Sequence, residues 1–364
     1  MPDYQQEIKE LEQKIANTKY NKSTQFAIGL MKAKLAKLKE KEHSRTSSGK
    51  KIEGYDVRKS GDGTVILIGF PSVGKSTILN ELTNADSKTA NYAFTTLEVI
   101  PGIMYYEGAK IQILDVPGII SGAASGKGRG KEVLSVVRSS DLMLIIIDVN
   151  QPNHYNVLLK EIFDANIRIN KEKPDLKIIK KASGGLKIST TIQLTKINIE
   201  TIKAIFKEMG ILNADVVVRS DIDIDELIDV IEGNRKYITA ITILNKIDLS
   251  TKENVEKVRK ELNADIAISA KNKTHLDELK RLIFERLNLI RIFLKEPRKE
   301  PDLKTPLIIK SGSTVKDVCN KLHKDFVLKF KFCKIWGTSS KFPGQKFMLD
   351  HVLNDKDIIE IHLK

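Results

Sequence analysis

The sequence predicts an α/β fold, in which a parallel sheet with flanking helices is accompanied by three smaller parts. Short apolar runs that end at Gly, Pro, Asp or Asn alternate with helical patterns from Thr64 onward, which is typical of a parallel sheet with crossover helices. The crossover between residues 148 and 238 is too long for one helix and two short loops. We therefore expect an α+β subdomain inserted in the sheet domain, a helical hairpin before it and a β-grasp domain after it.

The first 60 residues predict a basic helical hairpin and a linker. Apolar residues recur at helical spacing over 8–15 and again over 26–38, with a polar break between them. A serine-rich stretch at 44–49 indicates a flexible linker. Helix-turn-helix reading of DNA is an alternative for such a pair, but a hairpin lying on the next domain accounts for the same pattern.

The sheet domain is expected in two pieces, at 61–165 and 237–288, with the insertion at 166–236 between them. The insertion has strand-like and helical patterns of its own. The runs expected to form the parallel strands are 65–68, 111–114, 142–147, 238–244 and 266–268.

Residues 289–364 predict a small β-grasp domain. A strand-like run at 307–310 is followed by a helix over 315–324, which begins behind the capping residues Ser313 and Thr314. Further strand-like runs then follow to the C-terminus.

Composition excludes several classes of protein. The longest apolar run is 142–147, which is far too short for a membrane span, and no signal peptide pattern is present, so a cytoplasmic protein without membrane association is expected. Cys319 and Cys333 are too few for a disulfide scaffold or a four-cysteine zinc site.

The positive charge is concentrated at the two ends of the chain. Of the formal net charge of +14, residues 1–60 carry +6 and residues 288–364 carry +7, so the middle is nearly neutral. Lysine and arginine bind phosphate backbones largely irrespective of sequence, so we expect ribosome or RNA binding through these segments. Solvated helix and strand faces are the alternative interpretation.

A phosphate-binding loop is indicated at 69–76, which matches G-x-x-x-x-G-K-[ST] between an expected strand and an expected helix. In such a loop backbone N–H groups surround the phosphates, the lysine reaches the β and γ oxygens, and the serine hydroxyl ligates Mg²⁺. A chance glycine-rich turn is the alternative. The residues expected to bind nucleotide here are Gly69, Pro71, Ser72, Val73, Gly74, Lys75, Ser76 and Thr77.

A metal site is expected near this loop. Two switch segments are also expected, the first at 92–97 and the second in the glycine-rich stretch 122–130 after Gly118. Asp115 ends the second strand, where its carboxylate can hold the water shell of Mg²⁺, and the Gly118 N–H is placed to meet a γ-phosphate. Thr96 is the preferred further metal ligand, with Thr95 as the alternative. The predicted metal set is Ser76, Thr96 and Asp115, and the predicted catalytic set is Lys75, Thr96 and Gly118.

Two further strand ends predict recognition of guanine. Asn245, Lys246 and Asp248 follow one strand, and a carboxylate at Asp248 accepts from guanine N1–H and the exocyclic amine, whereas adenine offers no N1–H. Ser269, Ala270 and Lys271 follow the next strand, where a backbone N–H can meet guanine O6. GTP and GDP are therefore the expected ligands.

The residue after Gly118 is Ile119 rather than glutamine. An apolar side chain cannot orient the attacking water, so slow intrinsic GTP hydrolysis is expected, with the missing element supplied by a backbone group, a monovalent cation or a partner.

The motifs at 69–77, 94–97 and 115–118 and the glycine-rich stretch 122–130 resemble the Obg superfamily, and more specifically the developmentally regulated GTP-binding proteins, with an archaeal member as the expected source. The resemblance spans essentially the whole chain. It implies a helical N-terminal domain, an inserted subdomain similar to the second domain of ribosomal protein S5 and a C-terminal TGS domain. It also implies association with ribosomes or RNA, a role in translation and a regulatory protein partner.

Two points stay open at this stage. Many related potassium-activated GTPases have Asn where this loop has Ser72, whose shorter side chain leaves potassium activation undecided. The contrasting function is a ribosome or RNA adaptor that holds GTP or GDP as a structural ligand with negligible turnover.

Overall fold

The computed structural model describes residues 4–46, 61–83, 100–115 and 136–364. The chain forms two compact units, one from Met1–Glu53 with Lys171–Tyr237 and the other from Gly54–Asn170 with Ile238–Lys364. Each unit is described by itself below. No helix among the described residues is long and apolar enough to cross a membrane.

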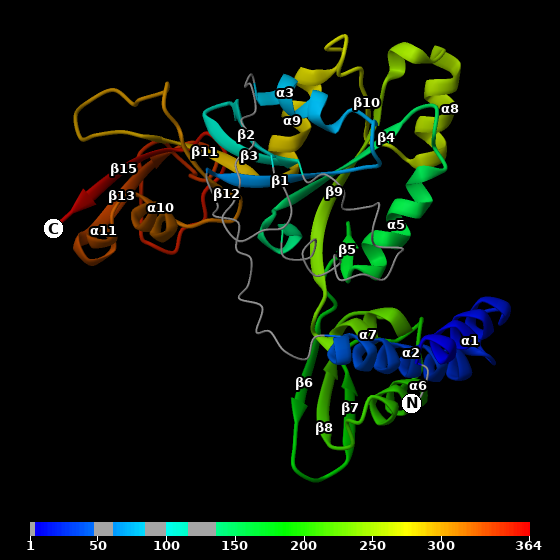
Figure 1. Cartoon of the computed structure of the whole chain (residues 1–364). Coiled ribbons are helices and arrows are strands. Elements are labelled where there is room, and N and C mark those ends of the chain that lie inside the picture. The colour runs from blue at the N-terminus through cyan, green and yellow to red at the C-terminus, as the bar shows by residue number, and fades with distance from the viewer. Residues whose placement is uncertain (1–3, 47–60, 84–99, 116–135) are drawn as a thin grey trace. The chain divides into compact units, whose positions relative to one another are not determined.

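The second unit contains a seven-stranded sheet with the order β10-β9-β4-β1-β3-β2, and β5 pairs with β9 (Figure 1). The pairs β3–β1, β1–β4, β4–β9 and β9–β10 are parallel, whereas β2 runs antiparallel to β3. The sheet contains the expected parallel strands together with β2 and β5, which the sequence patterns did not indicate. The bounds are β1 Gly63–Ile68, β2 Ile100–Tyr106, β3 Ala109–Asp115, β4 Leu142–Asp148, β5 Ile167–Ile169, β9 Lys236–Asn245 and β10 Ile266–Ala267.

Helices cover both faces of this sheet, which explains the unbroken apolar runs of its central strands. Alternate residues of β4 point to opposite faces, so Ile145 packs in the core under α5 and α8, while Leu144 packs in the core under α3 and α9. Every residue of β1 and of β4 is buried. The helices are α3 Lys75–Thr83, α5 His154–Asp164, α8 Lys252–Leu262 and α9 Leu276–Arg286.

The C-terminal domain belongs to the same unit and has the expected β-grasp form. Its five strands have the order β12-β11-β15-β13-β14, with β11 and β15 parallel at the centre. A capping box between Thr314 and Asp317 starts the first helix, which ends at Leu322 because His323 is extended. The bounds are β11 Leu289–Leu294, β12 Leu307–Lys310, α10 Val315–Leu322, α11 Lys324–Lys329, β13 Phe330–Trp336, β14 Gln345–Phe347 and β15 Ile358–Leu363.

The first unit combines the N-terminal hairpin with the inserted segment. A three-stranded sheet, β6-β8-β7, packs on two helices, and α2 of the hairpin packs on the same helices. The expectation that the hairpin lies on the domain next in the chain is therefore wrong, because its apolar residues Ile28 and Ala33 are buried in the core of the inserted segment. The bounds are α1 Tyr4–Asn17, α2 Gln25–Thr46, β6 Leu176–Lys180, β7 Leu186–Thr190, α6 Ile199–Glu208, β8 Ala214–Val218 and α7 Ile224–Glu232.

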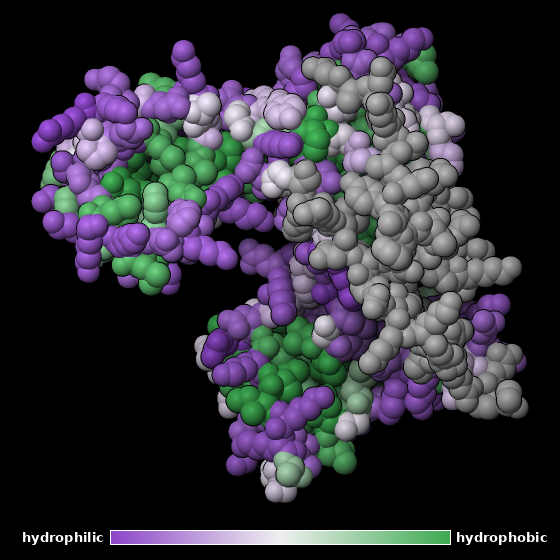
Figure 2. Space-filling model, turned by 60° about the vertical axis from the view of Figure 1, so that its left-hand side comes forward, coloured by the Kyte–Doolittle hydropathy of each residue, from purple (hydrophilic) through white to green (hydrophobic). Residues whose placement is uncertain are grey.

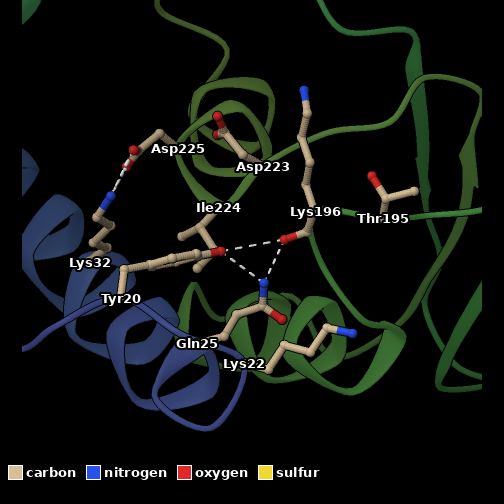
Figure 3. A pocket seen from close by; sticks show the side chains of 9 residues that line it. All are labelled: Tyr20, Lys22, Gln25, Lys32, Thr195, Lys196, Asp223, Ile224 and Asp225. Atoms are coloured by element: carbon tan, nitrogen blue, oxygen red, sulfur yellow. Dashed lines mark hydrogen bonds and ion pairs between the residues drawn. The ribbon is translucent and has the colours of Figure 1, made fainter.

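Polar contacts fix the start of α2 on the inserted segment, around a hollow of about 370 Å³ (Figure 3). The Gln25 amide donates to the Tyr20 hydroxyl at 2.8 Å and to the Lys196 carbonyl, and Lys32 pairs with Asp225 at 2.7 Å. The lysines and aspartates that line the hollow largely offset one another in charge. We therefore interpret the hollow as part of the contact that holds α2 on the inserted segment.

Candidate nucleotide-binding site

The predicted nucleotide residues that the structure describes lie at one edge of the seven-stranded sheet. The glycine-rich loop follows β1, Asp115 ends β3 and Asn245 ends β9, while Ser269 follows β10. Because these strands are parallel to one another, their carboxyl ends meet at the same edge. Segments separated by almost 200 residues are thereby brought together.

The loop can form only with glycine at position 74. Gly74 has φ +96°, and a Cβ atom there would lie 2.4 Å from Nδ2 of Asn245. Any side chain would therefore clash with Asn245 of the predicted base-recognition segment, residues 245–248, and would strain the backbone. The loop residues Pro71, Ser72, Ser76 and Thr77 are exposed, as a surface that receives a ligand requires.

The Lys75 ammonium lies against the backbone of its own loop. It donates to the carbonyl oxygens of Gly69 and Phe70, both at 2.9 Å. Burial lowers the pKa of Lys75 below its ordinary value, although the charge of Asp115 acts in the opposite direction. A phosphate group arriving in the loop supplies a stronger, charged acceptor for the same ammonium group.

Asp115 is a buried carboxylate with unused acceptor capacity. It is 1% exposed, and its Oδ2 accepts a hydrogen bond from the Ser76 hydroxyl at 2.8 Å. Its Oδ1 has no hydrogen-bond partner among the described residues. Burial raises the pKa of Asp115, while the hydrogen bond from Ser76 and the charge of Lys75 oppose that rise. A buried carboxylate oxygen beside a serine hydroxyl fits the oxygen ligands and water shell of Mg²⁺.

Asn245 connects the phosphate loop to the segment after β10. Its side chain is 2% exposed, its Nδ2 donates to the Val73 carbonyl at 2.8 Å, and its Oδ1 accepts from the Ala270 N–H at 3.1 Å. The sequence places Asn245 on the base. In the structure its amide joins two loops of the site.

Asp248 is the exposed carboxylate of the base-recognition segment. Its Oδ1 accepts from the Ser269 hydroxyl at 2.6 Å, which orients the carboxylate. Lys246, in the left-handed conformation with φ 65°, directs its ammonium to Asp148 at 2.8 Å. Sequence analysis missed Asp148, although its position at the end of β4 was a usable signal.

His154 is a second residue that sequence analysis missed. It begins α5, and its ring lies 4.2 Å from that of Phe70, the second residue of the phosphate loop, centroid to centroid. Phe70 also packs against both cores of the sheet, so the loop is held by contacts from several elements.

The predicted switch residues lie outside the described residues. These are Thr95, Thr96, Gly118 and Ile119, so their roles stay predictions. The described part of the site nevertheless joins the predicted phosphate loop, a candidate Mg²⁺ carboxylate and the predicted base-recognition segment.

Comparison with protein-family models gives matches within residues 64–363. Residues 64–181 match a family model described as a 50S ribosome-binding GTPase, residues 183–289 match the C-terminal region of that domain, and residues 290–363 match a TGS domain.

Relatives resemble the chain over nearly its whole length. A GTP-binding protein of Methanocaldococcus jannaschii is 50% identical over 364 residues, which is 99% of this chain and 93% of the relative. Human developmentally-regulated GTP-binding protein 2 is 42% identical over 359 residues, 98% of each chain. Ribosome-interacting GTPase 1 of Saccharomyces cerevisiae is 43% identical over 362 residues, again 98% of each.

Proposed function

We propose, since the chain belongs to the family of developmentally regulated GTP-binding proteins, that it is a GTP-hydrolysing molecular switch that acts in translation on the ribosome. The observation that carries this proposal is the meeting of the phosphate loop, Asp115 and the Asn245–Asp248 segment at one sheet edge. The base-recognition and phosphate segments are joined directly through Asn245, so the two ends of one nucleotide are bound by a single connected site.

The phosphate end uses groups that are already in position. Lys75 binds the β and γ oxygens after leaving the Gly69 and Phe70 carbonyls, and the backbone N–H groups of the loop meet the remaining oxygens. Ser76, Asp115 and Thr96 are the proposed holders of Mg²⁺, which supplies neutralisation of the charge that develops on the phosphates.

The base end selects guanine through Asp248. The Ser269 hydroxyl uses one lone pair of Oδ1, so Oδ2 and the second lone pair of Oδ1 remain to accept from the guanine N1–H and the exocyclic amine. Adenine has a lone pair at N1, which would face the carboxylate and oppose binding.

Hydrolysis is proposed to be slow in the isolated protein. Ile119 follows Gly118 where an amide side chain would be needed to orient water, so a partner or a monovalent cation supplies that element. Potassium remains a candidate for this cation despite the short Ser72 side chain.

Association with the ribosome is proposed to use the basic ends of the chain. The segments 1–60 and 288–364 together carry +13 of the +14 net charge. Ribosomal RNA is the polyanion that this charge and the name of the yeast relative favour. A cytoplasmic location and a regulatory protein partner belong to the same proposal.

Single-turnover hydrolysis of labelled GTP tests the proposal. Phosphate release should be slow for the protein alone and should accelerate when ribosomes are added, whereas Lys75→Ala should abolish both rates. Matched reactions in KCl and NaCl at equal ionic strength test the cation, with a several-fold lower rate in NaCl expected if potassium participates. GTP binding without measurable turnover in any of these reactions would favour the adaptor that holds GTP as a structural ligand.

A further inference from the structure

Helices α10 and α11 cover one face of β13, β14 and β15 in the C-terminal domain, whereas the opposite face of β11 and β12 packs through Leu289 and Ile308 on the core of the seven-stranded sheet. The core under α10 contains Cys333, Ile335 and Ile359, and alternate residues of the same strands therefore point to the opposite side. The strand register places Phe332 opposite His362 of β15 and Trp336 opposite Ile358. Residues opposite each other share a face, so these side chains lie together on the side away from the core. We call this opposite side the open face and define it by Lys295, Phe332, Lys334, Trp336, Lys346 and His362. In Figure 2 hydrophobic side chains reach the surface of this domain among hydrophilic ones.

Two aromatic rings of the open face each carry a lysine ammonium. Lys295 lies 4.4 Å from the centroid of the Trp336 ring, and Lys346 lies 4.8 Å from that of Phe332. Phe332 is stacked on His362 at 4.3 Å, and since β15 and β14 flank β13, His362 and Lys346 approach Phe332 from different sides.

The turn before β14 supports the second ring. A Cβ atom on Gly344 would lie 3.3 Å from the Trp336 ring, and this residue has φ +75°. Glycine at this position lets the backbone lie directly against the indole. Trp336 is half-buried, with the Gly344 backbone close to its ring and the end of the flexible Lys295 side chain over it.

The charge of the open face is positive after its internal ion pairs are counted. Glu360 lies at the base of the face, with its side chain 5% exposed, and accepts from Lys295 at 3.1 Å and from His362 at 2.7 Å. Lys334 approaches it at 3.7 Å. Burial acts to raise the pKa of Glu360, but these partners outweigh burial and hold the pKa below its ordinary value. One carboxylate is thus paired with two lysines and a histidine, and with the further charge of Lys346 the face remains positive.

We propose that the open face is a stacking platform for single-stranded RNA. An unpaired base replaces a lysine ammonium over Trp336 or Phe332, and the displaced lysine, on its flexible stem, pairs with the adjacent phosphate. Duplex RNA does not fit this arrangement, because its bases are already stacked on one another. The proposal rests on the proposed ribosome association and names the surface and the form of RNA that it uses.

Trp336 is the single tryptophan of the chain, so its fluorescence reports on the platform in the intact protein. We expect a 12-nucleotide oligouridine to quench this fluorescence saturably and with a dependence on salt, and a duplex of equal length to quench it much less. In fluorescence anisotropy with labelled oligouridine, Trp336→Phe should retain binding, because an aromatic ring is still present for a base to stack on. Trp336→Ala and Phe332→Ala should each lower the affinity by about tenfold or more.

Tyr105 provides the matched control, because it is an aromatic residue on β2 of the other sheet and is 71% exposed. Tyr105→Ala should leave the affinity unchanged. Lys346→Gln, which leaves both rings in place, should reduce the slope of log affinity against log salt by about 0.7. Binding of a GTP analogue by every variant verifies that the chain is folded.

Three results would overturn the platform. Oligouridine binding without quenching places RNA elsewhere on the chain, and equal affinity for Trp336→Ala and the unaltered protein removes the ring from binding. In the third result the unaltered protein does not bind oligouridine, but Trp336→Ala still loses ribosome association. This result would assign the open face to the binding of a protein. In all three cases the unaltered protein still hydrolyses GTP and is still stimulated by ribosomes, whereas failure of the proposed function is seen in those two rates of the unaltered protein.

Discussion

The two sheets of the second unit differ in how many of their faces are covered, and this difference decides where each presents chemistry. The seven-stranded sheet is covered by helices on both faces, so its polar groups gather at one edge, where β1, β3 and β9 end. The five-stranded sheet is covered by helices on one face, and on the other face only β11 and β12 pack on the seven-stranded sheet, so charged and aromatic residues occupy that face over β13, β14 and β15. The edge of the seven-stranded sheet presents loops that are held in defined positions. The open face of the five-stranded sheet is instead a broad surface formed by strand residues.

The strongest test of the edge is Gly74→Ala. The new methyl group would lie 2.4 Å from Asn245 Nδ2 at a backbone φ of +96°, so the contact between the two loops must break. We expect GTP affinity to fall by about hundredfold or more, as the loss of several aligned hydrogen bonds implies. Titration with a fluorescent GTP analogue measures this.

Gly312→Ala is the matched control, because Gly312 has φ +80° and open space around its Cβ position. It carries the backbone strain without the clash, and it should leave GTP affinity unchanged. Equal losses of GTP affinity in the two variants would show that backbone strain alone lowers the affinity. The contact between Gly74 and Asn245 would then not be needed for GTP binding.

The specificity of the edge is tested by Asp248→Asn. An amide at this position donates to the carbonyl at C2 of xanthine, so affinity should fall for GTP and rise for xanthosine triphosphate, with a change in their ratio of about a hundredfold or more. Competition titrations with both nucleotides measure the ratio. Asp277→Asn, at a side chain that is 96% exposed on α9, is the control. Unchanged preference for GTP in Asp248→Asn would remove this carboxylate from base recognition.

The junction of the two sheets is tested by Arg291→Ala. The Arg291 guanidinium pairs with Asp355 in its own domain and with Glu107 in the turn between β2 and β3, both at 2.6 Å. We expect the free energy of unfolding to fall by about 1 kcal/mol, since these partners are partly exposed. Urea denaturation measures the change, and Arg298→Ala is the control in an exposed loop.

The same variant has a predicted pH dependence. Burial acts to raise the pKa of Asp355, but the hydrogen bonds and charge of Arg291 outweigh it and hold the pKa below the ordinary value. Stability from a carboxyl with a lowered pKa is present above the pKa of the unfolded chain and is lost as the pH falls through the native pKa. The difference between Arg291→Ala and the unaltered protein should therefore be constant near neutrality and shrink below about pH 4. A difference that grows on acidification would contradict this.

The smallest expected effect concerns the covered face of the five-stranded sheet. Burial raises the pKa of Cys333 to about 12, with the neighbouring Cys319 adding to the rise. The unfolded thiol ionises from about pH 8.5, so the native state holds its proton longer and the stability from this group is lost as the pH rises above that value. The unaltered protein should lose stability between pH 8 and pH 9 by about 0.7 kcal/mol more than Cys333→Ala does. Parallel urea curves for both proteins test this, and rapid alkylation of the native thiol at pH 8 would contradict the burial.

The phosphate loop and the strands around it were predictable because their signals are local. The loop at 69–76 combines fixed residue types with a strand before it and a helix after it, and buried parallel strands are unbroken apolar runs. β2 gave no such signal, because its antiparallel pairing with β3 at the sheet margin leaves it only partly buried. The break between α10 and α11 was also missed, since it depends on one extended residue, His323.

The sequence by itself determined which residue types follow which strands, because the order of segments and the periodicity of apolar residues are properties of neighbouring positions along the chain. It therefore determined the α/β class, the phosphate-loop motif and the positive charge at both ends, and it predicts guanine selection by Asp248. Only the tertiary structure decided that Asn245 joins Val73 to Ala270, that Lys246 pairs with Asp148, and that the lysines of the C-terminal domain lie over its aromatic rings. Each of these contacts joins residues far apart in the chain, and strand register, which brings such residues opposite one another, is set by the packing of the whole sheet rather than by any local pattern.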